Sequence, residues 1–288
     1  MVPHQGRSSQ NPRIRGRNNV TATLVESNIV EPRSEPRMSL KRRARIVRWF
    51  ILAAMVIVLE VSTRAGWIDR NQMVPPSEIV SRIVAIIPSE SFLEDLMRTS
   101  FTIVCAFLIG LFFGVPLGVL LWRVKTLGRV LEPFIVTGYA MPTLLFYPIL
   151  VAVLGLNSGP IIAIASTMAL IPIALTTMVA LGQVKPVLLK LARSVDASPR
   201  EQYFKVLFPA ATPLIFPGIK LGFIYAVIGT IAMEFILASR GLGFRAGFMY
   251  RELYVADMWA YIAIVVVFSI GVNSALGWAE RTIRRDMT

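Results

Sequence analysis

The sequence is poor in the residues that build metal sites, disulfides and charged surfaces. In 288 residues it has one cysteine, Cys105, and one histidine, His4, which excludes a disulfide within the chain and a Cys/His metal site. Only 16% of its residues are charged, against about 25% in soluble domains. No GxxxxGK[ST] motif occurs, so the chain lacks the phosphate-binding loop of P-loop ATPases.

The chain is rich in apolar residues: 55% of its residues are hydrophobic, and its mean hydropathy is +0.63. About 20 apolar residues cross a bilayer as a helix. The uncharged stretches 99–122, 133–184 and 258–279 meet this length, and the second has room for two crossings around a turn at 157–160. The composition predicts an all-α membrane protein with six transmembrane helices, at about 49–67, 99–122, 134–156, 160–182, 214–238 and 258–280.

Basic residues are unevenly distributed. Eleven of the 30 Lys and Arg residues lie in the first 48 positions, which predicts a disordered basic tail over residues 1–47 that can contact anionic lipid. With the N-terminus inside, 22 basic residues fall on the cytoplasmic side and seven outside. This bias predicts that both termini are cytoplasmic. It also explains the net charge of +13 without a nucleic-acid partner.

The predicted cytoplasmic loop 183–213 is the most informative segment. It divides into a short helix at about 186–195 and a second one with Ser198 as N-cap and Pro199 at its first position. Leu188, Leu191 and Val195 would share a face of the first piece. Such apolar faces either dock on a partner or pack under the chain's own bundle, and the pattern alone leaves both open.

The loop resembles the cytoplasmic signature loop of ABC importer permeases. In that family a Glu-Ala-Ala triplet is followed after three residues by Gly, and after nine more by Ile-x-Leu-Pro. Lys190-Leu191-Ala192 falls on the triplet, Asp196 on the glycine and Val206–Pro209 on the ending. Lys190 and Asp196 depart from the pattern, although Asp tolerates left-handed backbone better than most residues. The resemblance implies ATPase coupling through Lys190, Leu191, Ala192, Arg193, Asp196, Ala197, Ser198, Tyr203, Phe204 and Pro209.

Two further patterns resemble the nitrate/sulfonate/taurine-type branch of these permeases. They are 233–238 (MEFILA) followed by Gly241-Leu242-Gly243, and the start of an outer segment at Pro75-Pro76-Ser77. The segment 141–156 lacks the Trp-Phe-Gly sequence usual in the branch. The likeness covers about residues 48–285.

The resemblance implies a type I ABC importer permease (MetI-like) fold in a multi-pass protein of the bacterial inner membrane. The chain would not be an enzyme and would carry no cofactor; ATP and Mg would be bound by a partner ATPase. Its expected partners are two ATPase subunits, a second permease copy in a homodimer, and a periplasmic or lipid-anchored substrate-binding protein. The expected solute is a small organic or inorganic anion of the sulfonate, taurine or nitrate type.

Glu234 is the acid of greatest interest, because a carboxylate within a span usually faces protein or a water-filled cavity. It is either a gate or pathway residue, or a structural acid bonded to backbone at the outer boundary. Five further side chains are candidates to line a path: Met141, Thr143, Phe146, Thr176 and Tyr225.

Two other classes of function are alternatives to an ABC importer permease. A self-contained secondary transporter or channel would carry intramembrane charge pairs or inverted repeats, and neither is evident. A membrane-embedded enzyme would need a nucleophile–base or metal constellation, which the sequence does not offer.

Overall fold

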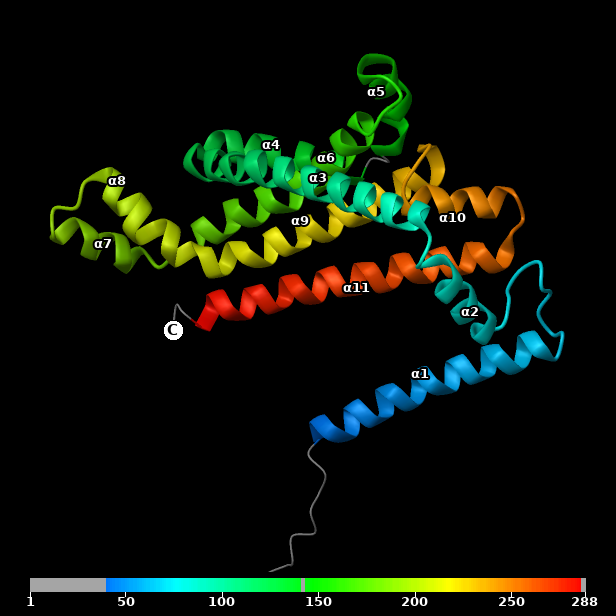
Figure 1. Ribbon diagram of the computed structural model, residues 1–288. Coiled ribbons are helices and arrows are strands. Elements are labelled where there is room, and N and C mark those ends of the chain that lie inside the picture. Colours follow the sequence, from blue (N-terminus) through cyan, green and yellow to red (C-terminus); the bar gives the residue numbers. More distant parts are fainter. Residues whose placement is uncertain (1–39, 141–142, 286–288) are drawn as a thin grey trace, which may run out of the picture. The chain divides into compact units, whose positions relative to one another are not determined.

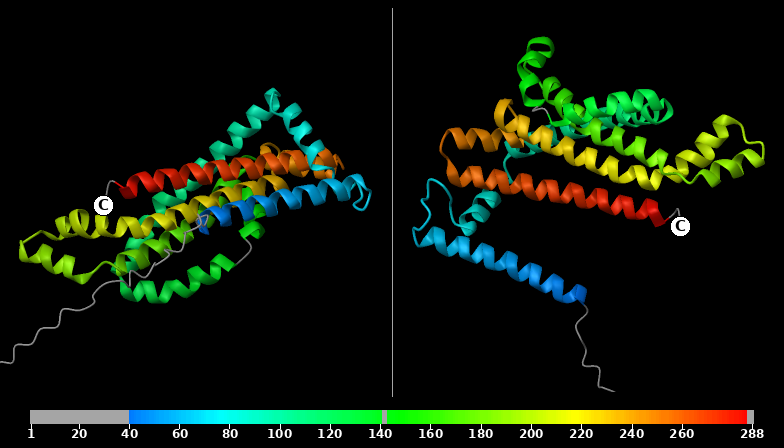
Figure 2. Two further views of the ribbon diagram at one scale, coloured as in Figure 1. Left: turned by 90° about the horizontal axis from the view of Figure 1, so that it is seen from below. Right: turned by 180° about the vertical axis from the view of Figure 1, so that it is seen from behind.

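The computed structural model describes residues 40–140 and 143–285, and every regular element within these ranges is helical. Figures 1 and 2 show their arrangement. The elements are α1 (Leu40–Arg64), α2 (Pro76–Ile86), α3 (Glu90–Arg123), α4 (Lys125–Ala140), the 3-10 turn η1 (Thr143–Phe146), α5 (Tyr147–Leu154), α6 (Gly159–Gly182), α7 (Pro186–Ser194), α8 (Pro199–Glu201), the π-helix η2 (Gln202–Leu207), α9 (Phe208–Leu237), α10 (Leu242–Arg251) and α11 (Val255–Arg285).

Five helices of the described residues are long and apolar enough to cross a membrane: Arg43–Arg64, Glu90–Arg123, Gly159–Gly182, a helical run within Pro199–Arg251, and Val255–Trp278. A sixth span results if Lys125–Gly138 and Thr143–Leu154, which meet at 87°, are counted together. The span predicted over 134–156 is therefore corrected to two helical pieces, α4 and η1–α5, on either side of residues 141 and 142, which lie outside the described residues.

Helix α1 begins at Leu40, so residues 40–47 are helical although they were predicted as part of the disordered tail. The stretch 40–47 contains no Gly or Pro, and half of its residues are Lys or Arg, which favour helix. The apolar helix therefore continues into the basic segment. The rest of the predicted tail, residues 1–39, lies outside the described residues.

The end of α1 is fixed by Glu60. Its carboxylate accepts hydrogen bonds from the Ser77 N–H (3.0 Å) and the Ser77 hydroxyl (2.7 Å). The hydroxyl of Thr63 bonds to the Leu59 carbonyl of its own helix (2.7 Å). Glu60 thus ties the end of α1 to the start of α2.

Helix α6 packs along α3 on one side and along α9 on another (Figures 1 and 2). Glycines at the contacts allow the backbones to approach closely. A Cβ at Gly118 of α3 would lie 2.4 Å from the carbonyl oxygen of Ala174, and one at Gly222 of α9 would lie 2.8 Å from that of Ala169. The positions that contact α6 in this way are Gly110, Gly114 and Gly118 on α3, and Gly218, Gly222 and Gly229 on α9.

A second apolar cluster joins α10, α11 and α2 to the start of α3 and the end of α9. Leu242, Ala246 and Tyr261 are buried there, and Phe92 of α3 joins them. Helix α2 begins directly after Pro75, at the start of the outer segment that opens with Pro75-Pro76. Ser89 caps α3 by accepting a hydrogen bond from the Phe92 N–H (3.3 Å), so this helix starts well before the predicted span at 99.

The glycine contacts predict that Gly118→Ala destabilises the protein. The methyl group would meet backbone and must push α3 and α6 apart, at a cost of about 1–3 kcal/mol. The measurement is the melting temperature of the purified protein in detergent. Gly271→Ala in α11, where nothing lies within 4 Å of the added methyl group, is the matched control and should keep or raise it. Equal melting temperatures for the two variants would contradict the prediction.

Candidate functional site

Two regions, one at each end of α9, carry most of the polar and exposed features that could serve function (Figure 1). We call residues 183–207, which precede α9, the coupling segment, after the role that the sequence predicts for them. We call Asp95, Thr99, Glu234 and the N–H groups of residues 241–243, which lie at the other end, the outer polar cluster.

The first corner of the coupling segment is formed by Asp196. Its φ angle is +52°, in the left-handed region, as predicted for the residue at the family's glycine position. The Asp196 N–H bonds to the Arg193 carbonyl and the Ala197 N–H to the Ala192 carbonyl, both at 3.1 Å. These bonds close the end of α7, so the corner is formed without glycine.

The second helix of the segment begins with a capping box, which confirms Ser198 as N-cap and Pro199 at the first helical position. The Ser198 hydroxyl accepts from the Glu201 N–H (3.3 Å), and Glu201 accepts from the Ser198 N–H (3.1 Å). The ammonium of Lys205 lies 2.8 Å from the same carboxylate. Local hydrogen bonds therefore fix the shape of the segment.

Residues Gln202–Leu207 then form a π-helix that leads directly into α9. A π-helix contains an extra residue per turn, and such insertions occur often at functional sites. Elements α8, η2 and α9 follow one another without a break.

The coupling segment has one attached face and one exposed face. Ala192 is buried, and Leu188 and Tyr203 pack against a core formed by Ala180, Leu181, Val184, Leu207, Ala211 and Ile215. Leu191, Val195 and Phe204 are 65%, 71% and 67% exposed. The single face predicted for Leu188, Leu191 and Val195 is therefore wrong: the first points to the bundle, and the other two do not.

The remaining signature residues lie mostly at the surface of the segment. Lys190 and Arg193 are exposed on α7, and Ala197 is half-buried beside the Asp196 corner. Pro209 is exposed on α9, directly after the π-helix. The exposed surface of the segment thus combines apolar side chains with positive charge.

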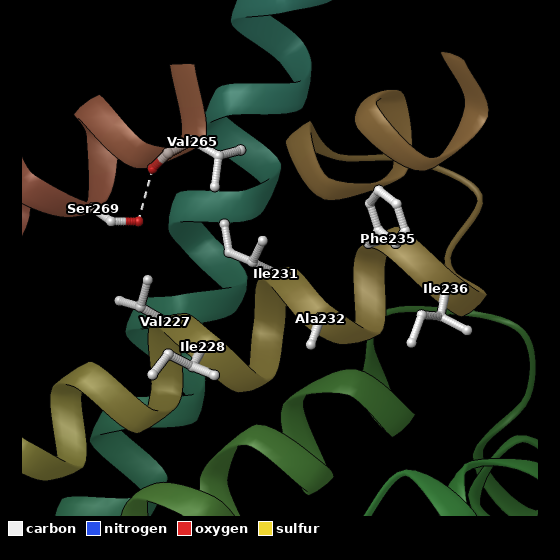
Figure 3. Close-up of a pocket in the computed structure, with 8 residues that line it drawn as sticks. All are labelled: Val227, Ile228, Ile231, Ala232, Phe235, Ile236, Val265 and Ser269. Atoms are coloured by element: carbon white, nitrogen blue, oxygen red, sulfur yellow. Dashed lines mark hydrogen bonds between the residues drawn. The ribbon is translucent and has the colours of Figure 1, made fainter. Parts of the chain in front are cut away.

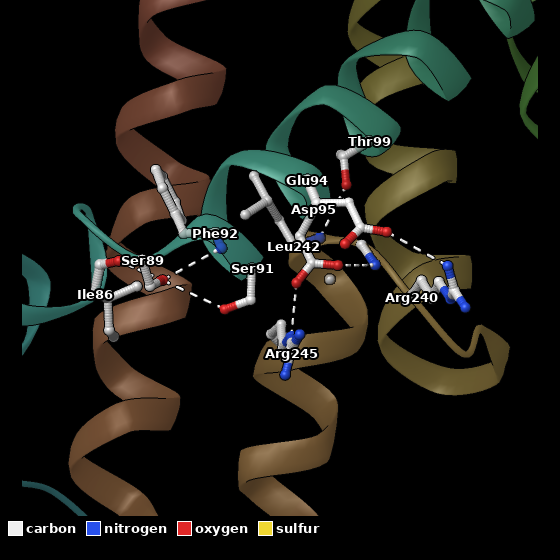
Figure 4. Close-up of polar contacts among 12 residues, drawn as sticks. Ile86, Ser89, Ser91, Phe92, Glu94, Asp95, Thr99, Arg240, Leu242 and Arg245 are labelled. Carbon is white, nitrogen blue, oxygen red and sulfur yellow. Dashed lines mark hydrogen bonds and ion pairs between the residues drawn. The ribbon is translucent and has the colours of Figure 1, made fainter.

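The outer polar cluster fastens the start of α10 to α3 and α9 (Figure 4). Asp95, Thr99 and Glu234 are all at most 4% exposed. Asp95 accepts from the Gly241 N–H (2.9 Å) and lies 2.6 Å from the Arg245 guanidinium. The Thr99 hydroxyl accepts from the Leu242 N–H (2.9 Å) and donates to Glu234 (2.8 Å), which also accepts from the Gly243 N–H (3.0 Å).

The same contacts explain why glycines flank Leu242. Gly241 has a φ angle of +112°, and a Cβ there would lie 2.6 Å from the Glu234 carboxyl carbon. A Cβ at Gly243 would lie 2.7 Å from the Cβ of Glu234. Both N–H groups reach the carboxylates only because neither residue has a side chain. Of the two roles considered for Glu234, this geometry favours the structural one.

The side chains proposed to line a path do not gather around Glu234. Thr143 and Phe146 lie in η1, and Thr176 of α6 faces Gly218 of α9. Tyr225 is half-buried on α9, and Met141 lies outside the described residues. Instead, Thr99 donates to Glu234, and Arg98 and Tyr147 line the same small cavity as Glu234. The sequence carried one sign of this cluster: Asp95 and Thr99 are four residues apart, at the start of the uncharged stretch 99–122, and so lie on the same face of a helix.

An apolar groove of about 440 Å³ lies between α9 and α11 (Figure 3). It is lined by Val227, Ile228, Ile231, Ala232, Phe235, Ile236, Val265 and Ser269. The Ser269 hydroxyl donates to the Val265 carbonyl of its own helix (2.8 Å). The groove therefore offers little to a polar solute.

The cluster predicts that Thr99→Val loosens α10. Valine has nearly the same shape but leaves the Leu242 N–H and the Glu234 carboxylate each one partner short, at a cost of about 1–3 kcal/mol per buried group. Hydrogen exchange of the 242–243 amides should quicken about tenfold or more. Thr167→Val is the matched control, because this exposed hydroxyl bonds only to the Ala163 carbonyl. Unchanged exchange in Thr99→Val would show that the cluster does not hold α10.

Known proteins resemble the chain in sequence and fold. The family model described as "Binding-protein-dependent transport system inner membrane component" matches residues 106–285. The taurine transport system permease protein TauC of Escherichia coli is 24% identical over 74% of this chain and 78% of its own. The nitrate import permease protein NrtB of Synechocystis is 28% identical over 55% of this chain and 57% of its own. Both agree with the branch that the motifs indicated.

Among solved structures, an inward-facing MetNI methionine ABC transporter contains a chain that matches with a TM-score of 0.58 and 21% identity. The match covers 68% of this chain and 95% of that one. This likeness confirms the type I importer permease fold. Since the family model spans more than half of the sequence, the chain belongs to the family of binding-protein-dependent transport system inner membrane components, the permeases of ABC importers.

Proposed function

We propose that this chain is the membrane-spanning subunit of an ATP-driven importer in which α9 transmits movement between the two ends of the bundle. The observation that carries the proposal is the continuity of α9. Its N-terminal end grows out of the coupling segment, and its C-terminal end holds α10 through Glu234. A push on the coupling segment would therefore reach the outer end of the bundle through one helix.

The partners follow from the family and from the exposed face. Two ATPase subunits, each binding ATP and Mg, would dock on the coupling segments of the two permease copies and close on each other when ATP binds. Leu191, Val195 and Phe204 supply apolar contact area, and Lys190 and Arg193 favour an acidic rim on the ATPase. A second copy of this chain would complete the pathway, and a periplasmic or lipid-anchored binding protein would deliver the solute.

In the bilayer, the coupling segment would face the cytoplasm and the outer polar cluster the opposite side. The excess of Lys and Arg in the predicted inner segments supports this orientation. As the solute we propose a small organic or inorganic anion. Support comes from the taurine and nitrate named for two relatives.

Docking through the coupling segment predicts that Phe204→Asp and Leu191→Asp release the ATPase. Each variant places a charge in an apolar contact, and loss of one central apolar anchor costs about 2 kcal/mol or more, or over tenfold in affinity. The measurement is the amount of P-loop ATPase that co-purifies with the tagged chain from its native cells in mild detergent. Val124→Asp, an exposed apolar residue at the end of α3, is the control and should retain the ATPase.

Recovery of the chain without an ATPase would contradict the proposal and favour a self-contained transporter or channel. Recovery of the ATPase in equal amount with all three variants would show that docking occurs elsewhere.

The left-handed corner predicts that Asp196→Gly keeps transport and Asp196→Val impairs it. Glycine adopts a φ of +52° freely, whereas for a β-branched side chain left-handed backbone costs about 1–2 kcal/mol. The readout is solute uptake per unit of ATP hydrolysed in reconstituted vesicles. Equal coupling ratios for Gly and Val would rule out a role for the corner.

A further inference from the structure

A small polar cavity lies beside the outer polar cluster, where the end of α9, the turn between α5 and α6 and the start of α3 meet. Its volume is about 40 Å³. Since one water needs about 10–15 Å³ measured in this way, the space suits about three waters. This is the size of a nitrate ion or of a sulfonate head group.

Arg98 brings a positive charge to this cavity. Its side chain comes from α3, is half-buried, and donates from Nη2 to the Ser158 hydroxyl (3.3 Å). A guanidinium carries five N–H donors, so most of them remain for another acceptor. Among the described residues no carboxylate forms an ion pair with Arg98, because Asp95, one turn earlier on α3, is taken by Arg245 and the Gly241 N–H.

Two guanidinium groups, those of Arg98 and Arg240, and one carboxylate, that of Glu234, line the cavity, so positive charge is in excess there. The Glu234 carboxylate accepts hydrogen bonds from Thr99 and from the Gly243 N–H. Arg240 stands at the rim, is 61% exposed, and lies 3.4 Å from Glu94. A loose, solvated pair of this kind contributes about 0–1 kcal/mol, so Arg240 can turn toward a ligand. Ser239, exposed on the same rim, adds a hydroxyl donor.

We propose that this cavity binds a small oxyanion, such as nitrate or the sulfonate group of an organic solute. Arg98 would hold it through paired N–H donors, the geometry in which guanidinium groups recognise planar and tetrahedral oxyanions. Arg240 and the two serine hydroxyls would complete the site. Its role as a subsite for transported solute rests on the proposed function, because the outer side is where an importer receives its solute; anion binding itself does not depend on transport.

The test uses the purified full-length chain in detergent. Sodium nitrate or sodium methanesulfonate is titrated against sodium chloride at constant ionic strength, and the melting temperature is recorded. A ligand that binds only the folded state raises it in a saturable way. We expect saturable stabilisation in the wild type and in Arg70→Gln, a surface arginine paired with Glu78 outside the cavity. The apparent dissociation constant should rise at least about tenfold in Arg98→Gln and less in Arg98→Lys, which keeps the charge.

Arg240→Gln changes an exposed residue and leaves the core intact, so weaker binding in this variant supports the site even if Arg98→Gln fails to fold. An equal rise in melting temperature in the wild type, Arg98→Gln and Arg240→Gln would be a general salt effect and would overturn the proposal. Stabilisation by added phosphatidylglycerol but not by the free anions would also overturn it, since the site would then hold a lipid phosphate. ATPase co-purification with the wild type is scored separately, so loss of the anion site and loss of the importer assignment give different results.

Discussion

The close contact of α6 with α3 and α9 is the constraint on which both functional regions depend. Glycines on α3 and α9 bring three helix backbones together without intervening side chains. In a lipid environment such contacts replace the hydrophobic effect as the source of helix association. Because α9 is held along its length by α6, it can connect the coupling segment to the outer polar cluster as one rigid element.

The two ends of α9 are built by different means. At the coupling segment the bonds are local: the Asp196 corner, a capping box and a π-helix follow one another within residues 196–207. At the outer polar cluster they join residues more than a hundred positions apart, such as Thr99 and Glu234. The local bonds suit a coupling segment that moves as a unit and keeps its shape. The long-range bonds fix where α10 begins.

Charge is arranged differently at the two ends as well. On the coupling segment, Lys190 and Arg193 are exposed beside apolar side chains, which suits a protein surface. In the outer polar cluster, the Asp95 carboxylate bonds to the Gly241 N–H and to Arg245, and the Glu234 carboxylate bonds to the Gly243 N–H and to Thr99. Arg98 lines a small cavity beside the cluster and donates to the Ser158 hydroxyl. The acids thus bond within the protein, whereas Arg98 forms no ion pair among the described residues.

The sequence by itself determined the helical membrane class, the family, and the local geometry of the coupling segment. Each of these depends on composition or on residues close in the chain, as with Ser198, Pro199 and Asp196. It did not predict the break between α4 and α5, the division of Leu188 from Leu191, or the partners of Glu234. These three features depend on which faces of distant helices meet. Because lipid and protein are equally apolar surroundings, an apolar face can point to either one, and the periodic pattern of the sequence does not say which. Only the tertiary structure, by placing Asp95 and Thr99 opposite the glycines of α10, showed that the Glu234 carboxylate bonds to Thr99 and to the Gly243 N–H.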